Sequence, residues 1–225
     1  MGADIPPEVN LICAVDMAGT PADYDSFKQK KVPIVADAAE SLGAEYKCRK
    51  VGLLADITIT SFHTSKIITT GEGGMIFTES EELAKECRLV VNQGYGPRGY
   101  AEHDHIAKGY NFRLSGMQAA LGCSQLSKLN RLLQDRRAKA LRYVNNLSGC
   151  VECLLPPEGF TSSYYSFLIM LASATERDSL RAHLEKVGVE TKLWTPVHRL
   201  PPYRSNAEFP NADRIYTRHL RLPIG

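Results

Sequence analysis

Two short apolar runs, separated by a segment with helix start signals, constrain the fold of this chain most. The runs are NLICAV at residues 10–15 and VPIVA at residues 32–36. Continuous apolar runs of this length are typical of strands buried in a parallel sheet. The intervening PADYDSFKQK begins with Pro21 and carries acidic residues in its first turn, so we expect a helix there. A strand–helix–strand unit predicts an α/β fold with a mostly parallel sheet.

The rest of the chain continues this alternation of strands and helices. Ser80 is predicted to cap one later helix and Thr175 another, each with acidic residues in the first turn. We therefore expect a large α/β domain over residues 1–125 and a small C-terminal α/β domain over residues 126–225. The predicted elements are strands at 56–62, 74–80 and 163–171, helices at 80–94, 115–147 and 175–188, and a long loop at 95–113.

Charge and composition exclude several classes of partner. The 225 residues are 44% hydrophobic and carry a net charge of +2, so neither nucleic acid nor an anionic membrane is an expected partner. No apolar stretch reaches the roughly 18 residues that a membrane helix needs, and no secretory signal is visible in the opening residues.

The six cysteines show no framework of spacings, which favours a reducing, cytoplasmic location. Cys150 and Cys153 form a CxxC pattern, but their surroundings predict a strand and no second pair exists to complete a zinc site. We interpret these two cysteines as structural.

The stretch SFHTSKIITTGEGGM at residues 61–75 places Lys66 between hydroxyl side chains and glycines, directly after a predicted strand. A lysine at such a junction is often a solvent-exposed charge. Asp37 follows another predicted strand and could equally cap a helix. However, the carboxyl ends of parallel strands meet at one edge of a sheet, where α/β proteins bind ligands. Lys66 and Asp37 could therefore face one crevice.

The same stretch offers groups suited to an anion. Ser61, Thr69 and Thr70 provide hydroxyl donors for a phosphate, and the glycines at 71, 73 and 74 allow close backbone approach. An amine, a carboxylate and a phosphate-binding hydroxyl loop are the parts that pyridoxal phosphate requires. This combination predicts a pyridoxal-phosphate site.

Five blocks of sequence, in order, carry a resemblance to a known family: VADAAESLGAEYKCRKVG, DITITSFHTSKIITTGEGGMIFT, GYNFRLSGMQAALG, PVHRLPPYR and FPNADRIYTRHLRLPI. They resemble the DegT/DnrJ/EryC1/StrS family of pyridoxal-phosphate-dependent nucleotide-sugar aminotransferases. The resemblance implies the fold type I, aspartate-aminotransferase-like architecture, with residues 1–125 as a partial cofactor-binding large domain. The segment ITTGEGGM is most similar to the corresponding segment of members that act on 4-keto-6-deoxy sugars, such as perosamine synthetases.

The resemblance also implies roles for individual residues. Lys66 would form the Schiff base, and Asp37 would pair with the pyridine nitrogen of the cofactor. Glu40 would lie beside the ring hydroxyl, Ser61 would contact the phosphate, and Asn111 would reach the phosphate in the neighbouring subunit of a homodimer. The implied substrates are a nucleotide-linked keto sugar and a glutamate or glutamine amino donor.

The chain also departs from the family pattern. Family members carry a further segment before ICAVDMAGTPADYD, which supplies the phosphate-binding loop and the aromatic that stacks on the cofactor, and they continue beyond LPIG. We therefore expect a half-built site, exposed apolar strand faces and weak activity of these 225 residues alone. The alternative function is a catalytically incomplete fragment that only dimerises or regulates. His63 has no expected role, and Arg113 and Lys108 could meet a nucleotide phosphate or simply be solvated.

Overall fold

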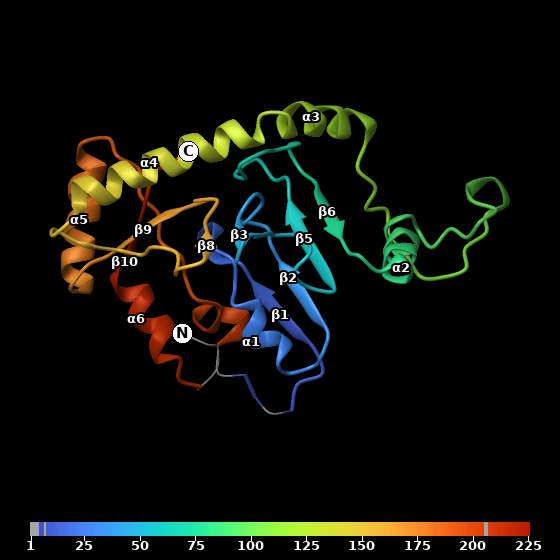
Figure 1. Cartoon of the computed structure of the whole chain (residues 1–225), viewed down its shortest axis with the longest axis horizontal. Helices are drawn as coiled ribbons and strands as arrows, with labels where there is room; N and C mark the ends of the chain where they lie inside the picture. The colour runs from blue at the N-terminus through green and yellow to red at the C-terminus, as the bar shows by residue number, and fades with distance from the viewer. Residues whose placement is uncertain (1–4, 7, 205–206) are drawn as a thin grey trace.

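The computed structural model describes residues 5–6, 8–204 and 207–225, and its central element is a four-stranded sheet (Figure 1). The strand order is β1 (Ile12–Val15), β2 (Ile34–Asp37), β5 (Ile57–Ser61) and β6 (Gly74–Phe77). The first three strands pair in parallel, and β6 pairs antiparallel to β5. The predicted mostly parallel sheet is therefore confirmed.

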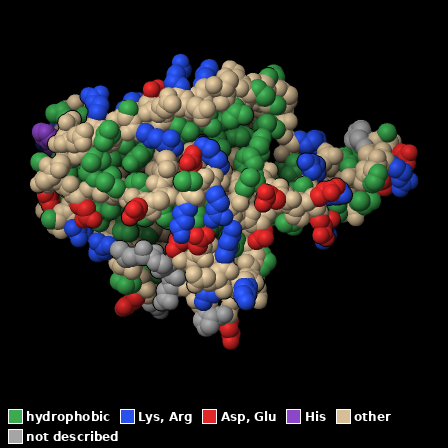
Figure 2. Space-filling model, viewed as in Figure 1, with side chains coloured by type: hydrophobic (Ala, Val, Ile, Leu, Met, Phe, Trp, Pro, Cys, Tyr) green, Lys and Arg blue, Asp and Glu red, His purple; other side chains and the backbone are tan. Residues whose placement is uncertain are grey.

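The two faces of this sheet differ in exposure. Ile12, Ala14, Ile34 and Ala36 alternate along β1 and β2 and are buried in a core that includes Tyr24 and Phe27 of the first helix, α1 (Tyr24–Lys28). On the opposite face the strand register aligns Val15, Asp37 and Ile59. Val15 is 47% exposed and Ile59 is 39% exposed, so the expected exposed apolar strand face is present. Figure 2 shows hydrophobic side chains reaching the surface near β5 and β6. We refer to this side of the sheet as the open face.

Helix α1 begins later than the position of Pro21 suggested. Asp23 is its N-cap, accepting a hydrogen bond from the Ser26 N–H, and Tyr24 is the first helical residue. The short helix connects two parallel strands, as predicted.

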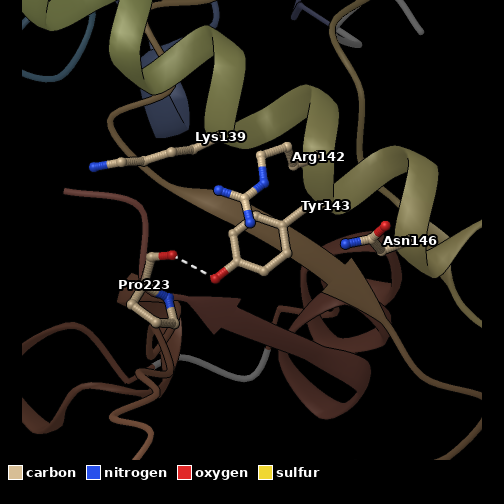
Figure 3. Close-up of a pocket in the computed structure, with 5 residues that line it drawn as sticks. All are labelled: Lys139, Arg142, Tyr143, Asn146 and Pro223. Atoms are coloured by element: carbon tan, nitrogen blue, oxygen red, sulfur yellow. Dashed lines mark hydrogen bonds between the residues drawn. The ribbon is translucent and has the colours of Figure 1, made fainter.

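A second core lies in the C-terminal part of the chain. The strands β7 (Glu152–Cys153), β9 (Phe167–Met170) and β10 (His219–Leu222) form an antiparallel sheet. Its inward side chains, including Phe167, Ile169 and Leu220, pack with residues of helices α4 (Leu129–Leu147) and α5 (Ala174–Lys186). The Tyr143 hydroxyl donates to the Pro223 carbonyl at 2.7 Å, tying α4 to the segment after β10 (Figure 3). The last helix, α6 (Pro210–Arg218), leads into β10.

A third sheet joins segments that are far apart in sequence. The strands β3 (Glu45–Tyr46) and β4 (Arg49–Lys50) pair with each other, and β8 (Phe160–Thr161) pairs with β3. After β8, residues 162–166 do not continue as a strand, so the predicted strand 163–171 shortens to β9. The reason is hydrogen bonding: the Ser163 N–H and the Ser162 hydroxyl both donate to the Gly19 carbonyl.

The long helical pattern at 115–147 forms two helices rather than one. Helix α3 (Gly116–Leu126) is separated from α4 by Ser127 and Lys128, although the two run as one ridge across the molecule (Figure 1). The Ser127 hydroxyl donates to the Ser124 carbonyl at 2.8 Å, a local bond that competes with helix continuation. In α5, the capping residue is Ser173 rather than Thr175.

The segment between β6 and α3 projects from the body of the molecule as an arm (Figure 1). It contains α2 (Glu81–Val91), capped by Ser80 as predicted, and a long loop with a 3₁₀ turn, η2 (Tyr100–Glu102). Asn92 and Asn111 form an isolated bridge that joins the two sides of the arm. The remaining 3₁₀ turns are η1 (Met17–Gly19), η3 (Val197–Arg199) and η4 (Pro201–Tyr203).

Within the described residues, no helix combines the length and apolar character needed to cross a membrane. In the same part of the chain, no group of three or more potential ligands could hold a metal ion. Cys150 and Cys153 are both free thiols, and burial raises the pKa of the Cys153 thiol, which opposes thiolate chemistry.

His219 is a buried titratable group in the second core. It is 1% exposed, its Nδ1 lies 2.9 Å from the Ile215 carbonyl, and its Nε2 accepts from the Trp194 N–H at 3.0 Å. Accepting at Nε2 requires the neutral ring, with the proton on Nδ1. Burial accordingly lowers the pKa of His219 below its ordinary value, and nearby Arg177 adds to the effect.

We expect His219 to make stability depend on pH. Because its pKa is lower in the folded state, its contribution is complete above the unfolded value of about 6.5 and is lost as the pH falls below it. Urea titrations at pH 8 and pH 5 should show a smaller pH-dependent loss for His219→Gln than for the unaltered chain. The control is His183→Gln, at an exposed position on α5. Equal pH dependence in all three proteins would contradict this assignment.

Candidate active site

Lys66 lies in a closed loop between β5 and β6. Both ends of the loop are fixed by backbone hydrogen bonds, from the Phe62 N–H to the Gly73 carbonyl at 2.8 Å and from the Thr70 N–H to the Phe62 carbonyl at 2.9 Å. A turn bond from the Lys66 N–H to the His63 carbonyl, at 3.0 Å, sets the position of the lysine within the loop. These backbone hydrogen bonds fix the loop that carries Lys66 to the edge of the sheet, so Lys66 does not lie at a flexible loop tip.

Glycine is required at two positions of this loop. Gly73 has φ of 154°, and a Cβ there would lie 2.6 Å from the Thr70 hydroxyl. A Cβ on Gly74 would lie 2.7 Å from the Thr60 carbonyl of the adjacent strand. The predicted close backbone approach is therefore found at both residues.

The threonines of the loop do not have the role that the sequence suggested. The Thr69 hydroxyl donates to the Phe62 carbonyl and the Thr70 hydroxyl donates to the Glu72 carbonyl, so both protons are used within the loop. The Ser61 oxygen instead accepts from the His63 N–H at 3.2 Å. An accepting hydroxyl keeps its own proton for donation, so Ser61 remains suited to an anion. His63 is bonded to Ser65 at its Nδ1 and lies 3.7 Å from Glu72, largely in solvent.

The structure brings Lys66, Ser61 and Glu40 to one small pocket. Lys66 is half-buried, and its Nζ lies 4.6 Å from the centroid of the Tyr165 ring, a cation–π distance. The solvent-exposed alternative for Lys66 is therefore not what the structure shows.

Glu40 enters this pocket from the turn after β2. Its Oε2 accepts from the Ala18 N–H at 2.9 Å, and Ala18 has the positive φ of 59°, which is uncommon for a residue other than glycine. Burial raises the pKa of the Glu40 carboxyl above its ordinary value. The bond from Ala18 and the positive charge of Lys66 act in the opposite direction without cancelling that effect.

Asp37 ends β2 on the open face of the sheet, where the register aligns it with Val15 and Ile59. Its Oδ1 accepts from the Ala39 N–H at 3.1 Å, so the carboxylate caps a turn, and no helix begins there. Asp37 is half-buried and does not line the small pocket that contains Lys66.

Tyr165, which lines this pocket, was missed in the sequence. Tyr165 is 7% exposed and hydrogen-bonds through its hydroxyl to Ser65 at 3.3 Å. Burial raises the pKa of Tyr165, but the Ser65 hydrogen bond, the charge of Lys66 and a hydrogen bond with Arg221 together outweigh it and leave the pKa below its ordinary value. No local sequence pattern identifies Tyr165, because its hydrogen-bond partner Ser65 lies 100 residues earlier in the chain.

Asp16, directly after β1, is a buried carboxylate outside this pocket that the sequence did not single out. It is 1% exposed and accepts hydrogen bonds from the Tyr24 and Ser41 hydroxyls and from the Ala22 N–H. Burial raises the pKa of its carboxyl, and the nearby charge of Asp37 adds to the increase. Its position directly after an apolar run was the available signal, since Asp37 follows β2 in the same way.

Asn111 does not approach Lys66 in this chain. It is exposed on the projecting arm, where it bridges Asn92. Arg113, on the same arm, donates to the side chains of Asn92 and Gln93, and Lys108 is exposed.

Comparison with known proteins identifies the family of the chain. Residues 2–225 match the DegT/DnrJ/EryC1/StrS aminotransferase family. The chain is 32% identical over 222 residues to GDP-perosamine synthase of Escherichia coli O157:H7, covering 96% of this chain and 60% of that protein. It is also 32% identical over 232 residues to dTDP-3-amino-3,4,6-trideoxy-alpha-D-glucose transaminase of Streptomyces venezuelae, covering 98% and 60% respectively.

A solved structure shows the same fold. The putative sugar aminotransferase Spr1654 of Streptococcus pneumoniae, in its PLP-form, superposes with a TM-score of 0.89 at 27% identity, covering 98% of this chain and 64% of the other. The expected fold type I architecture and the family's cofactor, pyridoxal phosphate, are thereby confirmed. This chain spans about 60% of the length of the curated relatives that it matches. The protein belongs to the DegT/DnrJ/EryC1/StrS aminotransferase family.

Proposed function

We propose that this protein is a pyridoxal-phosphate-dependent aminotransferase that moves an amino group from glutamate or glutamine to a nucleotide-linked keto-deoxy sugar. The observation that carries the proposal is the position of the Lys66 amine, half-buried in one pocket with Ser61 and Glu40 at the carboxyl ends of the parallel strands. That edge of the sheet is where α/β proteins bind ligands.

The residues at this edge fit the cofactor. Lys66 supplies a primary amine, Asp37 a carboxylate on the open face, and Ser61 a hydroxyl whose proton is available to donate. When bound, pyridoxal phosphate would supply an aldehyde for the amine and an electron-accepting ring. Asp37 would keep a proton on the ring nitrogen, Glu40 would lie beside the ring hydroxyl, and Ser61 would donate to the phosphate.

The chain's own groups also prepare Lys66 for proton transfer. The amine contacts the face of the Tyr165 ring, which attracts its charged form. Glu40 is held by the Ala18 N–H, so its carboxyl keeps a fixed position near the amine. Lys66 would take a proton from the amino donor's carbon and return it at the other end of the transfer, as a general acid and base.

The substrate class rests on the relatives. Their names specify GDP- and dTDP-linked sugars, so the family supports a nucleotide-sugar acceptor. We place the acceptor in the 4-keto-6-deoxyhexose class because the loop sequence ITTGEGGM resembles that of perosamine synthetases.

The arm supports a homodimer with shared sites. Tyr110 and Phe112 stack at 4.9 Å and are 59% and 67% exposed, which is unusual for large aromatic side chains without a partner. Asn111 lies between them. We propose that the arm packs against a second copy and that Asn111 reaches the cofactor phosphate held by that copy. The division into a large cofactor-binding domain at 1–125 and a small domain at 126–225 is part of the same proposal.

The assignment of Lys66 can be tested with purified protein and pyridoxal phosphate. The unaltered chain should give the visible absorption band of a lysine adduct, and borohydride reduction followed by peptide mass mapping should locate the added mass on Lys66. Lys66→Ala should lose both signals, because it removes the attacking amine. Lys186→Ala, an exposed position on α5, is the control and should keep them. An unchanged band in Lys66→Ala would refute the assignment.

Asp37→Asn should impair catalysis far more than cofactor retention. The carboxylate's charge matters most when negative charge develops on the ring, so we expect a loss of about 3 kcal/mol in transition-state stabilisation. Asparagine keeps the size of the side chain and an oxygen that can accept from the Ala39 N–H. The measurement is the single-turnover rate with glutamate, alongside the cofactor dissociation constant. An unchanged rate would leave Asp37 as the cap of a turn.

A further inference from the structure

Hydrogen bonds join three side chains in a row beside the Lys66 pocket. The Tyr165 hydroxyl lies 3.3 Å from the Ser65 hydroxyl, and the Ser65 hydroxyl lies 2.9 Å from Nδ1 of His63. Tyr165 lines the pocket and is buried, whereas the His63 side chain is 46% exposed. The row therefore runs from the wall of the pocket to solvent. Its longest link is the one to Tyr165, and hydrogen bonds at functional sites are often long before a ligand binds.

The backbone fixes the direction of these hydrogen bonds. The Ser65 N–H donates to Nδ1 of His63 at 3.1 Å, so Nδ1 carries no proton in the neutral ring. The Ser65 hydroxyl therefore donates to the same nitrogen, and its oxygen accepts from the Tyr165 hydroxyl. Each proton in the row thus points away from the pocket and towards His63.

The outer nitrogen of His63 is placed to exchange a proton with water. Because Nδ1 is unprotonated, the neutral ring has its proton on Nε2. Nε2 lies 3.4 Å from the Thr64 hydroxyl and 3.7 Å from a carboxylate oxygen of Glu72, which is exposed. The His63 N–H donates to the Ser61 hydroxyl oxygen at 3.2 Å, which ties the histidine to the loop that carries Lys66. An imidazole in this position can shuttle a proton.

Charged groups around the pocket act on the Tyr165 hydroxyl. Burial raises its pKa, and the charge of Glu40 adds to the increase. The Ser65 hydrogen bond, the charge of Lys66 and a hydrogen bond with Arg221 lower the pKa and outweigh both. The charged groups that face Tyr165 are Lys66, Arg221, Arg136 and Glu40. This tyrosine therefore releases its proton more readily than one in water, and the row of hydrogen bonds offers that proton a route.

We propose that Tyr165, Ser65 and His63 form a proton relay between the Lys66 pocket and solvent. In one passage the Tyr165 O–H bond breaks as a new O–H bond forms on Ser65, and the proton already on Ser65 moves to Nδ1 of His63. His63 then releases its Nε2 proton to water. One proton leaves, and the phenolate that remains on Tyr165 faces the Lys66 ammonium. The reverse passage returns a proton from water.

The relay controls the charge that Lys66 meets in the pocket, and its use in transamination rests on the proposed function. A phenolate stabilises the ammonium form of Lys66, whereas a neutral hydroxyl leaves only the weaker attraction of the ring face. His63 and Ser65 act through Tyr165, so they are positioning residues. The competing route is direct loss of the proton to water at Ser65, which is itself exposed.

The relay predicts that His63 changes tautomer when Tyr165 ionises. Each passage leaves the ring proton on Nδ1 instead of Nε2, so the two states of Tyr165 match two tautomers of His63. The measurement is NMR of the chain without cofactor, with isotope-labelled histidine and tyrosine rings, titrated through the pKa of Tyr165. The two ring nitrogens of His63 should exchange their chemical shifts as the Tyr165 signal moves. The signals are assigned by their loss in His63→Phe and Tyr165→Phe.

Variants interrupt the relay at each step. Tyr165→Phe should leave His63 in one tautomer over the same pH range. Ser65→Ala should raise the pKa of Tyr165 by about 1 pH unit, and His63→Phe by about half as much, because the phenolate loses hydrogen-bonded support. His183→Phe, the same change at an exposed position on α5, is the control and should leave the Tyr165 pKa unchanged. Circular dichroism of each variant reports whether the fold is kept.

Three results would overturn the relay. The first is a single His63 tautomer throughout the ionisation of Tyr165. The second is an unchanged Tyr165 pKa in His63→Phe, which would assign the proton to water at Ser65. The third is an unchanged Tyr165 pKa in Lys66→Ala, where loss of the facing cation should raise it, because the relay would then not serve the Lys66 pocket.

These measurements need no cofactor, so they separate the relay from the proposed function. A coupled His63 tautomer in a chain that forms no lysine adduct with pyridoxal phosphate would keep the relay and contradict the aminotransferase. A Lys66 adduct in a chain whose His63 tautomer never changes would keep the function and contradict the relay.

Discussion

The contact between Gly19 and the serines after β8 is the constraint on which the site depends. The Gly19 carbonyl accepts from the Ser163 N–H at 2.9 Å and from the Ser162 hydroxyl at 3.0 Å. Gly19 has φ of 93°, and a Cβ there would lie 2.5 Å from the Ser163 hydroxyl, so the two segments approach as closely as glycine allows. The same contact places Glu40, through Ala18, on one side of the pocket and Tyr165 on the other.

A consequence of this contact is that one acidic and two basic side chains from the two halves of the chain gather near Tyr165. Glu40 and Lys66 belong to the large-sheet side and Arg221 to the small-sheet side, and both cations lie at cation–π distance from the Tyr165 ring. Two cations on one ring repel each other, but the ring face and the Glu40 charge offset that repulsion. The pKa of Tyr165 is lowered in this setting although burial raises it, because its hydroxyl hydrogen-bonds to Ser65 and Arg221 and lies near the charge of Lys66.

Much of the large sheet could be predicted from the sequence, because its signals are local. The apolar runs of β1 and β2, the Ser80 cap and the glycines beside Lys66 each depend on neighbouring residues. Lys66, Ser61 and Glu40 are predicted as site residues from strand ends and from the sequence of the family, and the structure places them in one pocket. Tyr165 could not be found in this way, because its role comes from a contact with Ser65 formed across the fold. The prediction that Thr69 and Thr70 donate to a phosphate was wrong for a different reason. The residue type alone does not reveal that each hydroxyl donates its proton to a nearby backbone carbonyl.

The open face leaves the Asp37 carboxylate accessible to a ligand, whereas the Asp16 carboxylate is enclosed in the core. Both residues follow buried strands, but the Asp16 oxygens accept from Tyr24, Ser41 and the Ala22 N–H inside the core. Asp37 uses Oδ1 on the turn at Ala39 and remains half-exposed beside the apolar Val15 and Ile59. A ring that covered this face would displace water from Asp37, and its protonated nitrogen would replace that water with a charged partner. In the lower dielectric that results, the pairing gains strength, so the apolar strand face contributes to the electrostatics of the site as well as to packing.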